Sequence, residues 1–259
     1  LGDRVSAEDK VIVDGKSVDV SLGQSLECRV LIYNKPIGEV CTRHDPEGRP
    51  TVFRALPKLK QGRWIAIGRL DINTSGLLIF TTDGELANKM MHPSSSIDRE
   101  YAVRVLGNVD EPMLERLKQG VLLEDGMARF TDVRFFDGEG ANRWYHCVVM
   151  EGRNREVRRL WESQEVQVSR LKRVRFGPVF LPSDVKVGTW KDLSQRELDV
   201  LMDELKLDRR KLPVFNPEAA KEEERRYKRQ RVRQREDARN PSPVVERKRK
   251  KVRMVGKRG

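Results

Sequence analysis

The sequence predicts an α+β fold, with a mixed, mostly antiparallel β-sheet and flanking helices. Two observations favour this class. Strand-like and helix-like segments interleave from residue 31 to about residue 205, instead of forming separate runs. Connections such as DGEG at residues 137–140 are short and glycine-rich, which is typical of hairpins between antiparallel strands.

Three helices are predicted from their capping residues. TDGE at residues 82–85 and SQRE at residues 194–197 both have the spacing of a capping box. DEP at residues 110–112 places an acidic side chain before a proline in the first turn, another typical helix start. From the stop signals that follow, these helices are expected to end near Met91, Leu207 and Gly120, respectively.

The strands are predicted from apolar and polar residues that alternate with period two. This pattern occurs in segments 64–68, 77–80, 101–105, 133–136 and 144–150. Residues 1–30 also read as short strands, broken at two glycine-containing turns. We expect this stretch to be the end of a small β-rich unit that begins upstream.

The charge is distributed unevenly along the chain. Its 259 residues carry a net charge of +12, and residues 211–259, with 18 Lys and Arg against 7 Asp and Glu, account for +11 of it. A segment this charged and proline-containing has little to bury, so we predict that residues 206–259 form a basic, disordered tail. It could serve solubility alone, but clustered arginines also neutralise phosphates, and we favour nucleic acid as its partner.

Composition excludes several classes of protein. No apolar run approaches the roughly 18 residues that span a bilayer, so we expect a soluble protein with no membrane partner. Three separated cysteines and three histidines offer neither a disulfide framework nor metal-ligand spacing. We therefore expect a cytoplasmic protein without a metal site.

The sharpest motif is GRLDINTSGLL at residues 68–78. A strand runs into a polar loop centred on Asp71, and a second strand leaves it. Loop residues held between two strands are common positions for functional side chains. Taken alone, Asp71 is better explained as a residue that only caps its own turn.

This motif resembles the signature of the RsuA-type ribosomal RNA pseudouridine synthase family. Four further blocks are similar to that family in the same order: NKPxG, REYxV, EGxxxEVRR and LKRVxFGP, at residues 34–38, 99–103, 151–159 and 171–178. The resemblance covers residues 31–205, and five ordered blocks are far more specific than one motif. One residue departs from it, because the family often has Gln where this chain has Glu156.

The resemblance implies a catalytic domain at residues 31–205, preceded at residues 1–30 by the last strands of a small RNA-binding domain. It implies site-specific isomerisation of a uridine in large-subunit ribosomal RNA, by base flipping and without a cofactor. The substrate could be naked RNA or an assembling ribosomal particle, and we expect the enzyme to be a monomer. Asp71 matches the catalytic aspartate, as nucleophile or as base.

An ionised carboxylate in a closed site needs a cation beside it, because burial alone would neutralise it. Val157, Leu160 and Trp161 form one buried stripe at helical spacing. Arg158 lies on the side of that stripe and can reach inward, although it could also only extend along the apolar surface. We expect Arg158 to pair with Asp71, as its place in the family block also suggests.

Other candidates follow from the family blocks. Tyr101 reads as a core aromatic residue, but it matches the tyrosine that stacks on the target base. Leu171 matches an apolar contact on the other side of that base. Arg69 could fill the gap that a flipped nucleotide leaves, or could only contact a phosphate.

A basic patch is predicted over residues 153–175, which hold eight Lys and Arg against three Glu. The patch residues expected to bind RNA are Arg155, Arg159, Lys172 and Arg173. Lys35 could extend the patch or be an ordinary surface lysine.

Three alternatives remain open. The chain could be a non-catalytic ribosome-assembly factor that binds RNA on the same fold, or a synthase that acts on small-subunit ribosomal RNA. A hydrolase using Asp71 would need a second carboxylate, and Glu156 is predicted to point away from Arg158.

Overall fold

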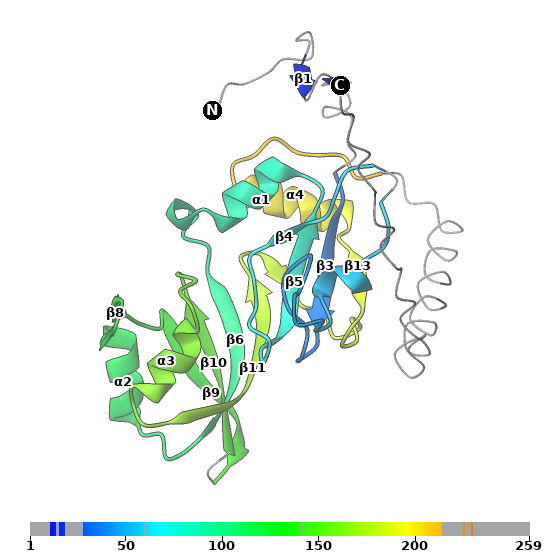
Figure 1. The fold of residues 1–259 in the computed structure, drawn as a ribbon. Coiled ribbons are helices and arrows are strands. Elements are labelled where there is room, and N and C mark those ends of the chain that lie inside the picture. The colour runs from blue at the N-terminus through cyan, green and yellow to red at the C-terminus, as the bar shows by residue number, and fades with distance from the viewer. Residues whose placement is uncertain are drawn as a thin grey trace, which may run out of the picture. The chain divides into compact units, whose positions relative to one another are not determined.

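The main element of the fold is a nine-stranded sheet. The structure is a computed structural model, which describes residues 11–13, 16–18, 28–59, 61–140 and 142–213, together with Arg225 and Arg229. The strand order is β13-β3-β5-β11-β6-β10-β9, with β4 and β12 paired to β5 and β11 (Figure 1). Among the described strands of this sheet, only β5 and β11 pair in parallel. The predicted fold class is therefore confirmed. The strands are β3 (Val30–Lys35), β4 (Ile65–Ile67), β5 (Ser75–Thr81), β6 (Arg99–Leu106), β9 (Asp132–Glu139), β10 (Asn142–Val149), β11 (Gln167–Phe176), β12 (Val179–Phe180) and β13 (Trp190–Asp192).

Two small hairpins and the helices complete the described elements. The hairpins pair β1 (Val11–Val13) with β2 (Lys16–Val18), and β7 (Val121–Leu123) with β8 (Gly126–Ala128). The α-helices are α1 (Gly84–Met91), α2 (Glu111–Gln119), α3 (Glu156–Glu162) and α4 (Gln195–Glu204), and short 3-10 helices cover Val52–Ala55 and Pro93–Ser95. Among the described helices, none has the length and apolar character needed to cross a bilayer.

The predicted helix starts are close to those observed. The capping box at Ser194 is present, and the Asp110 side chain caps α2. At α1 the prediction is wrong by one residue, because Asp83 is the N-cap and its carboxylate accepts from the Glu85 and Leu86 amides. A carboxylate one position later satisfies the same free amides that the Thr82 hydroxyl was expected to satisfy.

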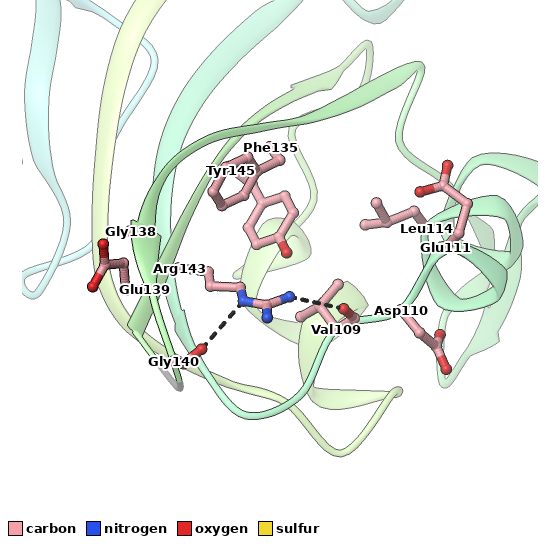
Figure 2. A pocket seen from close by; sticks show the side chains of 10 residues that line it. All are labelled: Val109, Asp110, Glu111, Leu114, Phe135, Gly138, Glu139, Gly140, Arg143 and Tyr145. Atoms are coloured by element: carbon pink, nitrogen blue, oxygen red, sulfur yellow. Dashed lines mark hydrogen bonds between the residues drawn. The ribbon is translucent and has the colours of Figure 1, made fainter.

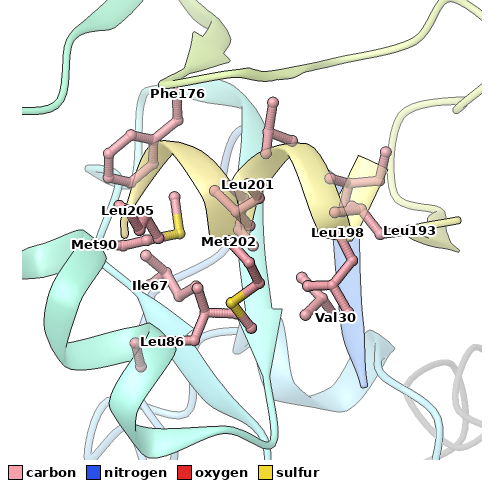
Figure 3. Packing of buried hydrophobic residues seen from close by; sticks show 14 of the residues in the cluster. Val30, Ile67, Leu86, Met90, Phe176, Leu193, Leu198, Leu201, Met202 and Leu205 are labelled. Carbon is pink, nitrogen blue, oxygen red and sulfur yellow. The ribbon is translucent and has the colours of Figure 1, made fainter. Parts of the chain in front are cut away.

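The first half of the sheet, β13, β3, β5 and β4, is packed on both faces. Cluster 1 joins Val30, Ile32, Leu77 and Ile79 to Leu86 and Met90 of α1 and to Leu198, Leu201 and Met202 of α4 (Figure 3). Cluster 3 lies on the opposite face and contains Leu31, Tyr33, Leu78 and Phe80, packed against Val52, Leu56, Trp64 and Leu70. Two apolar faces explain why β3 is buried along its whole length.

The second half, β11, β6, β10 and β9, has one core. Cluster 2 packs Val103, Val105, Tyr145, Cys147 and Leu171 against Met113 and Leu117 of α2 and Val157, Leu160 and Trp161 of α3. The halves are joined where β5 pairs with β11, through Lys172 with Ser75 and Arg173 with Gly76.

Gly76 makes this junction possible. Its φ is +101°, and a Cβ atom there would lie 2.2 Å from the carbonyl oxygen of Arg173. Only glycine fits both the conformation and the close approach. The glycine of the sequence motif is therefore a packing requirement at the seam between the two halves.

The chain beyond α4 packs back onto the first half as far as it is described. Leu207 and Leu212 contact cluster 1, and Arg210 pairs with Asp83 at 3.2 Å and Glu85 at 2.7 Å. Apart from Arg225 and Arg229, the predicted basic tail from residue 214 onward lies outside the described residues, as does most of the stretch before residue 28.

Candidate active site at the Asp71 turn

Asp71 lies in the turn between β4 and β5, at the seam of the two halves. The Thr74 amide donates to the main-chain carbonyl of Asp71 at 3.0 Å, and the Gly38 amide donates to that of Ile72 at 2.8 Å. The backbone therefore closes the turn without the carboxylate. Among the described residues, no hydrogen bond or ion pair engages the half-buried Asp71 side chain, which leaves it available to a substrate.

The Lys35 ammonium binds main-chain carbonyls of this turn. Its side chain is 0% exposed, and its Nζ donates to the carbonyls of Pro36, Asp71 and Thr74 at 3.0, 3.1 and 2.9 Å. The expectation of a surface lysine that contacts RNA is wrong, because the ammonium is enclosed and occupied by these carbonyls. Burial lowers the pKa of Lys35, and the nearby Asp71 carboxylate opposes that shift.

Cys41 supports the residue just before Asp71. Its Sγ accepts from the Leu70 amide at 3.4 Å and donates to the Leu70 carbonyl at 3.3 Å. Burial raises the pKa of this thiol, so it stays neutral and serves as a weak hydrogen-bonding group. Nothing in the spacing of Cys41 in the sequence points to this contact.

Arg158 points inward from α3, as its helical position predicted. It is 5% exposed, and its guanidinium donates to the Val168 carbonyl at 3.1 Å and to the Asn73 carbonyl at 3.0 Å. The expected direct ion pair with Asp71 is not formed, because the turn presents the Asn73 carbonyl to Arg158 instead. The two charges are nevertheless close enough to interact: burial and Arg155 lower the pKa of Arg158, and Asp71 opposes that change.

Two buried polar atoms near the turn have no hydrogen-bond partner among the described residues. They are the Nε of Arg158 and the Oγ1 of Thr74. Buried polar groups are nearly always satisfied in folded proteins, and exceptions gather at sites that bind ligands. The inner side of the Asp71 turn therefore has unused hydrogen-bonding capacity.

Tyr101 and Leu171 lie on the face of the second half that carries cluster 2. Tyr101 is half-buried and packs against both cluster 2 and cluster 3, so it spans the seam between the halves. Leu171 is nearly buried in cluster 2, and its strand partner is Val103, two residues from Tyr101. Side chains directly opposite on paired strands share a face, so the two residues expected to contact the base are neighbours.

The basic patch is smaller than the sequence predicted. Arg173 is 2% exposed and donates to the Leu77 carbonyl at 2.8 Å, so its expected contact with RNA is wrong. Arg159 forms two bonds of 2.8 Å to Asp125, and Arg155 lies 3.5 Å from Glu162. Asp125 lies outside the segment over which the charge was counted, and Glu162 lies within it but, among the described residues, pairs with only one of the eight cations.

Two predicted RNA contacts remain open to solvent. Arg69 is exposed beside the turn, and Lys172 is partly exposed on β11. Among the described residues, neither is engaged by an acidic group. Their predicted roles are compatible with these positions.

Glu156 was predicted to point away from the site, and it is instead nearly buried. It is 5% exposed, and its Oε2 accepts from the Arg153 amide at 3.3 Å. Burial raises the pKa of Glu156, while Arg153 and Arg99 act in the opposite direction. At the first position of a short helix, this carboxylate meets the amides of the preceding turn, which its helical angle alone does not reveal.

A separate hollow of about 460 Å³ lies at the far end of the second half, between the start of α2 and the β9–β10 hairpin (Figure 2). None of the predicted site residues line it. Its one arginine, Arg143, donates to the carbonyls of Gly140 and Val109, both at 3.2 Å. With Asp110, Glu111 and Glu139 around it, this hollow does not suit an anion.

The fold and the Asp71 turn define the class of protein. The solved structure titled "Crystal structure of pseudouridylate synthase" superimposes with a TM-score of 0.61 over 77% of this chain and 83% of that one, at 24% identity, which shows a shared fold. Residues 29–163 match the family model described as RNA pseudouridylate synthase. The chain therefore belongs to the RNA pseudouridylate synthase family, and the resemblance read from the five motif blocks is confirmed.

Three curated relatives share one more specific name within this family. The chain is 60% identical over 231 residues to "Ribosomal large subunit pseudouridine synthase B" of Pseudomonas aeruginosa, which covers 89% of this chain and 60% of the relative. It is 52% identical to the protein of that name from Vibrio cholerae, over 90% of this chain and 74% of the relative. The Pasteurella multocida protein is 58% identical, and the chain spans 59% of it. The chain thus spans about three fifths of two of these relatives.

Proposed function

We propose that the chain isomerises one uridine of large-subunit ribosomal RNA to pseudouridine, with Asp71 as the catalytic residue. The observation that carries this proposal is the Asp71 turn. Its carboxylate is unengaged among the described residues, while buried cations hold the backbone around it. Relatives at 52–60% identity that carry the name of this activity support the choice of substrate.

The reaction sets what each residue must do. The bond from ribose to a ring nitrogen breaks, and the base rotates. A ring carbon then bonds to the ribose and loses its proton, while the freed ring nitrogen gains one, so substrate and product are isomers. Asp71 supplies the carboxylate, as nucleophile or as base toward the sugar. Arg158 places a buried positive charge close to that carboxylate. Tyr101 and Leu171 contact the flipped base, and Arg69 fills the gap it leaves.

Lys35 has a positioning role in this proposal. Because its ammonium bonds to the carbonyls of Asp71 and Thr74, it fixes the turn at both ends. A carboxylate held within a few tenths of an ångström of its working position contributes more than a mobile one. Lys172, Arg155 and Arg159 would contact RNA at the edge of the site, the last two in exchange for their present acidic partners.

The test is to incubate the protein with unmodified large-subunit ribosomal RNA and map pseudouridine at single-nucleotide resolution. Asp71→Asn keeps the shape of the side chain and removes its charge. We expect one new site with the unaltered protein, a loss of about 10³-fold or more in rate for the variant, and RNA affinity within about threefold. Turnover retained in Asp71→Asn would refute the mechanism. Tight binding without product from either protein would favour an assembly factor.

A further inference from the structure

The second half of the sheet has a face that no described helix covers. Cluster 2 occupies one face, and the side chains of β11, β6, β10 and β9 that point the other way are all half-buried or exposed. We call this the outer sheet face. Its central residues are Arg104, Trp144, His146, Arg170, Lys172 and Phe136. An antiparallel sheet can leave one face open to water, so what this face binds must be argued from its side chains.

Positive charges meet on this face without acidic partners. Arg104 of β6 and Arg170 of β11 are directly opposite in the strand register, and Lys172 is opposite Ala102. Like charges at opposed positions destabilise a sheet. Among the described residues, no carboxylate pairs with these three cations, and Arg104 donates only to the Ser169 hydroxyl at 2.9 Å. A bound anion would relieve this repulsion.

Aromatic rings alternate with these cations. Trp144 is opposite Arg104 on the neighbouring strand, with the Arg104 guanidinium 5.9 Å from the centre of its ring. Phe136 is 64% exposed, and its ring lies 4.9 Å from that of His146. The rings of Phe136 and His146 border a hollow of about 470 Å³.

The acidic groups around this hollow already have basic partners. Glu100 binds Arg175 at 2.8 Å and His146 at 2.6 Å, and Asp132 binds Arg134 at 2.8 Å. Two more carboxylates lie on this face at its β9 edge, Asp137 opposite Trp144 and Glu139 opposite Asn142, and among the described residues neither pairs with a cation. The unpaired cations Arg104, Arg170 and Lys172 lie on β6 and β11, which β10 separates from β9.

We propose that the outer sheet face binds a single-stranded segment of RNA. Bases stack on Trp144 and Phe136, and phosphates contact Arg104 and Arg170. Single strands expose both base faces and phosphates, which matches rings interleaved with cations, whereas a duplex hides its base faces and would leave the rings unused. This inference rests on the proposed function in one respect, the choice of RNA as the class of partner. It adds a second contact surface, on the side of the sheet opposite Tyr101 and Leu171.

The test uses a labelled single-stranded oligoadenylate of about 12 nucleotides, a length within the usual range for such sites. It contains no uracil, so binding is measured apart from isomerisation. In fluorescence anisotropy, Trp144→Leu is expected to raise the Kd about tenfold, the effect of losing one stacked base. Arg104→Gln combined with Arg170→Gln should raise it as well and lower the salt slope by roughly 1.4, the value for two phosphate contacts on a single strand.

A matched control removes the same charge elsewhere. Lys186→Gln combined with Arg196→Gln changes two exposed cations outside this face and should leave the Kd within about twofold. If both double variants lost oligoadenylate affinity equally, the proposal would be overturned, because the loss would then depend on net charge alone. Equal affinity for an adenylate–uridylate duplex, or displacement by polyglutamate as effective as by RNA, would also overturn it.

Failure of this proposal and failure of the proposed function give different results. If the outer sheet face does not bind RNA, oligoadenylate affinity is the same in all variants while pseudouridine still forms in ribosomal RNA. If the chain is not a synthase, no pseudouridine forms, whatever the oligoadenylate measurements show.

Discussion

Two groups of basic side chains among the described residues differ in what they bind. The buried group donates to main-chain carbonyls, and its members are Lys35, Arg158 and Arg173. The surface group pairs with carboxylates, and its members are Arg153, Arg159 and Arg175. A cation enclosed with carbonyls fixes the backbone, whereas a cation paired at the surface mainly cancels charge. The first group thus shapes the candidate site, and the second reduces the patch that RNA would meet.

The largest effect that this contrast predicts is for Lys35→Met. The variant keeps the length of the side chain but leaves three carbonyls without their donor in a buried place. We expect the free energy of unfolding to fall by about 2–4 kcal/mol, with loss of isomerase activity as the turn loosens. Urea denaturation followed by circular dichroism measures the first, and pseudouridine mapping the second.

Lys186→Met is the matched control, because Lys186 is exposed. It should change the free energy of unfolding by less than about 0.5 kcal/mol. If Lys35→Met were as mild as this control, the carbonyl contacts would not hold the turn, and the contrast between the two groups would fail.

Glu156→Gln, at the start of α3, is expected to change the free energy of unfolding by a smaller amount and to raise it. Burial raises the pKa of this carboxyl, so the folded protein holds its proton more tightly than the unfolded chain does. The stability due to Glu156 is therefore complete below the ordinary pKa of 4.5 and is lost as pH rises through the raised value. Gln has nearly the same shape and never ionises.

The variant should match the original protein at low pH and exceed it by about 0.5–1 kcal/mol at neutral pH. Urea midpoints measured on both sides of pH 4.5 test this. A less stable variant at neutral pH would show that the ionised carboxylate gains more from Arg99 and Arg153 than burial costs it.

The sequence predicted the helix starts, five strands of the sheet and the Asp71 turn, because these depend on local chemistry. It did not predict β3 and β11, two interior strands of the sheet. Capping carboxylates and hydroxyls, turn glycines and strand alternation act over a few residues, and five ordered motif blocks identified the family. Lys35 was misplaced because lysine is nearly always exposed, although here it is the last residue of β3, a strand buried along its whole length. Arg173 was misplaced because its carbonyl partner, Leu77, lies on another strand. Long-range partners decide whether a cation is structural or free, and a local charge count does not contain them.

The smallest effect is predicted for Arg159→Gln, in the surface group. Arg159 holds the pKa of Asp125 at about 2, below its ordinary value of 3.8, through two hydrogen bonds. A lowered carboxyl pKa contributes stability that is present above pH 3.8 and is lost as pH falls toward 2. In the variant the Asp125 pKa should move back toward 3.8, which an NMR titration of its side-chain carboxyl measures directly.

That return should be incomplete, because Arg153 remains 3.5 Å from Asp125. Both groups of the pair are open to solvent, so the urea midpoint should hardly change, and added salt should remove what difference there is. A shift in the Asp125 pKa without a matching loss of stability would show that the surface pair organises charge and not the fold. A loss as large as that of Lys35→Met would instead place Arg159 with the buried cations, as a residue that supports the start of α3 and, through Arg158, the Asp71 turn.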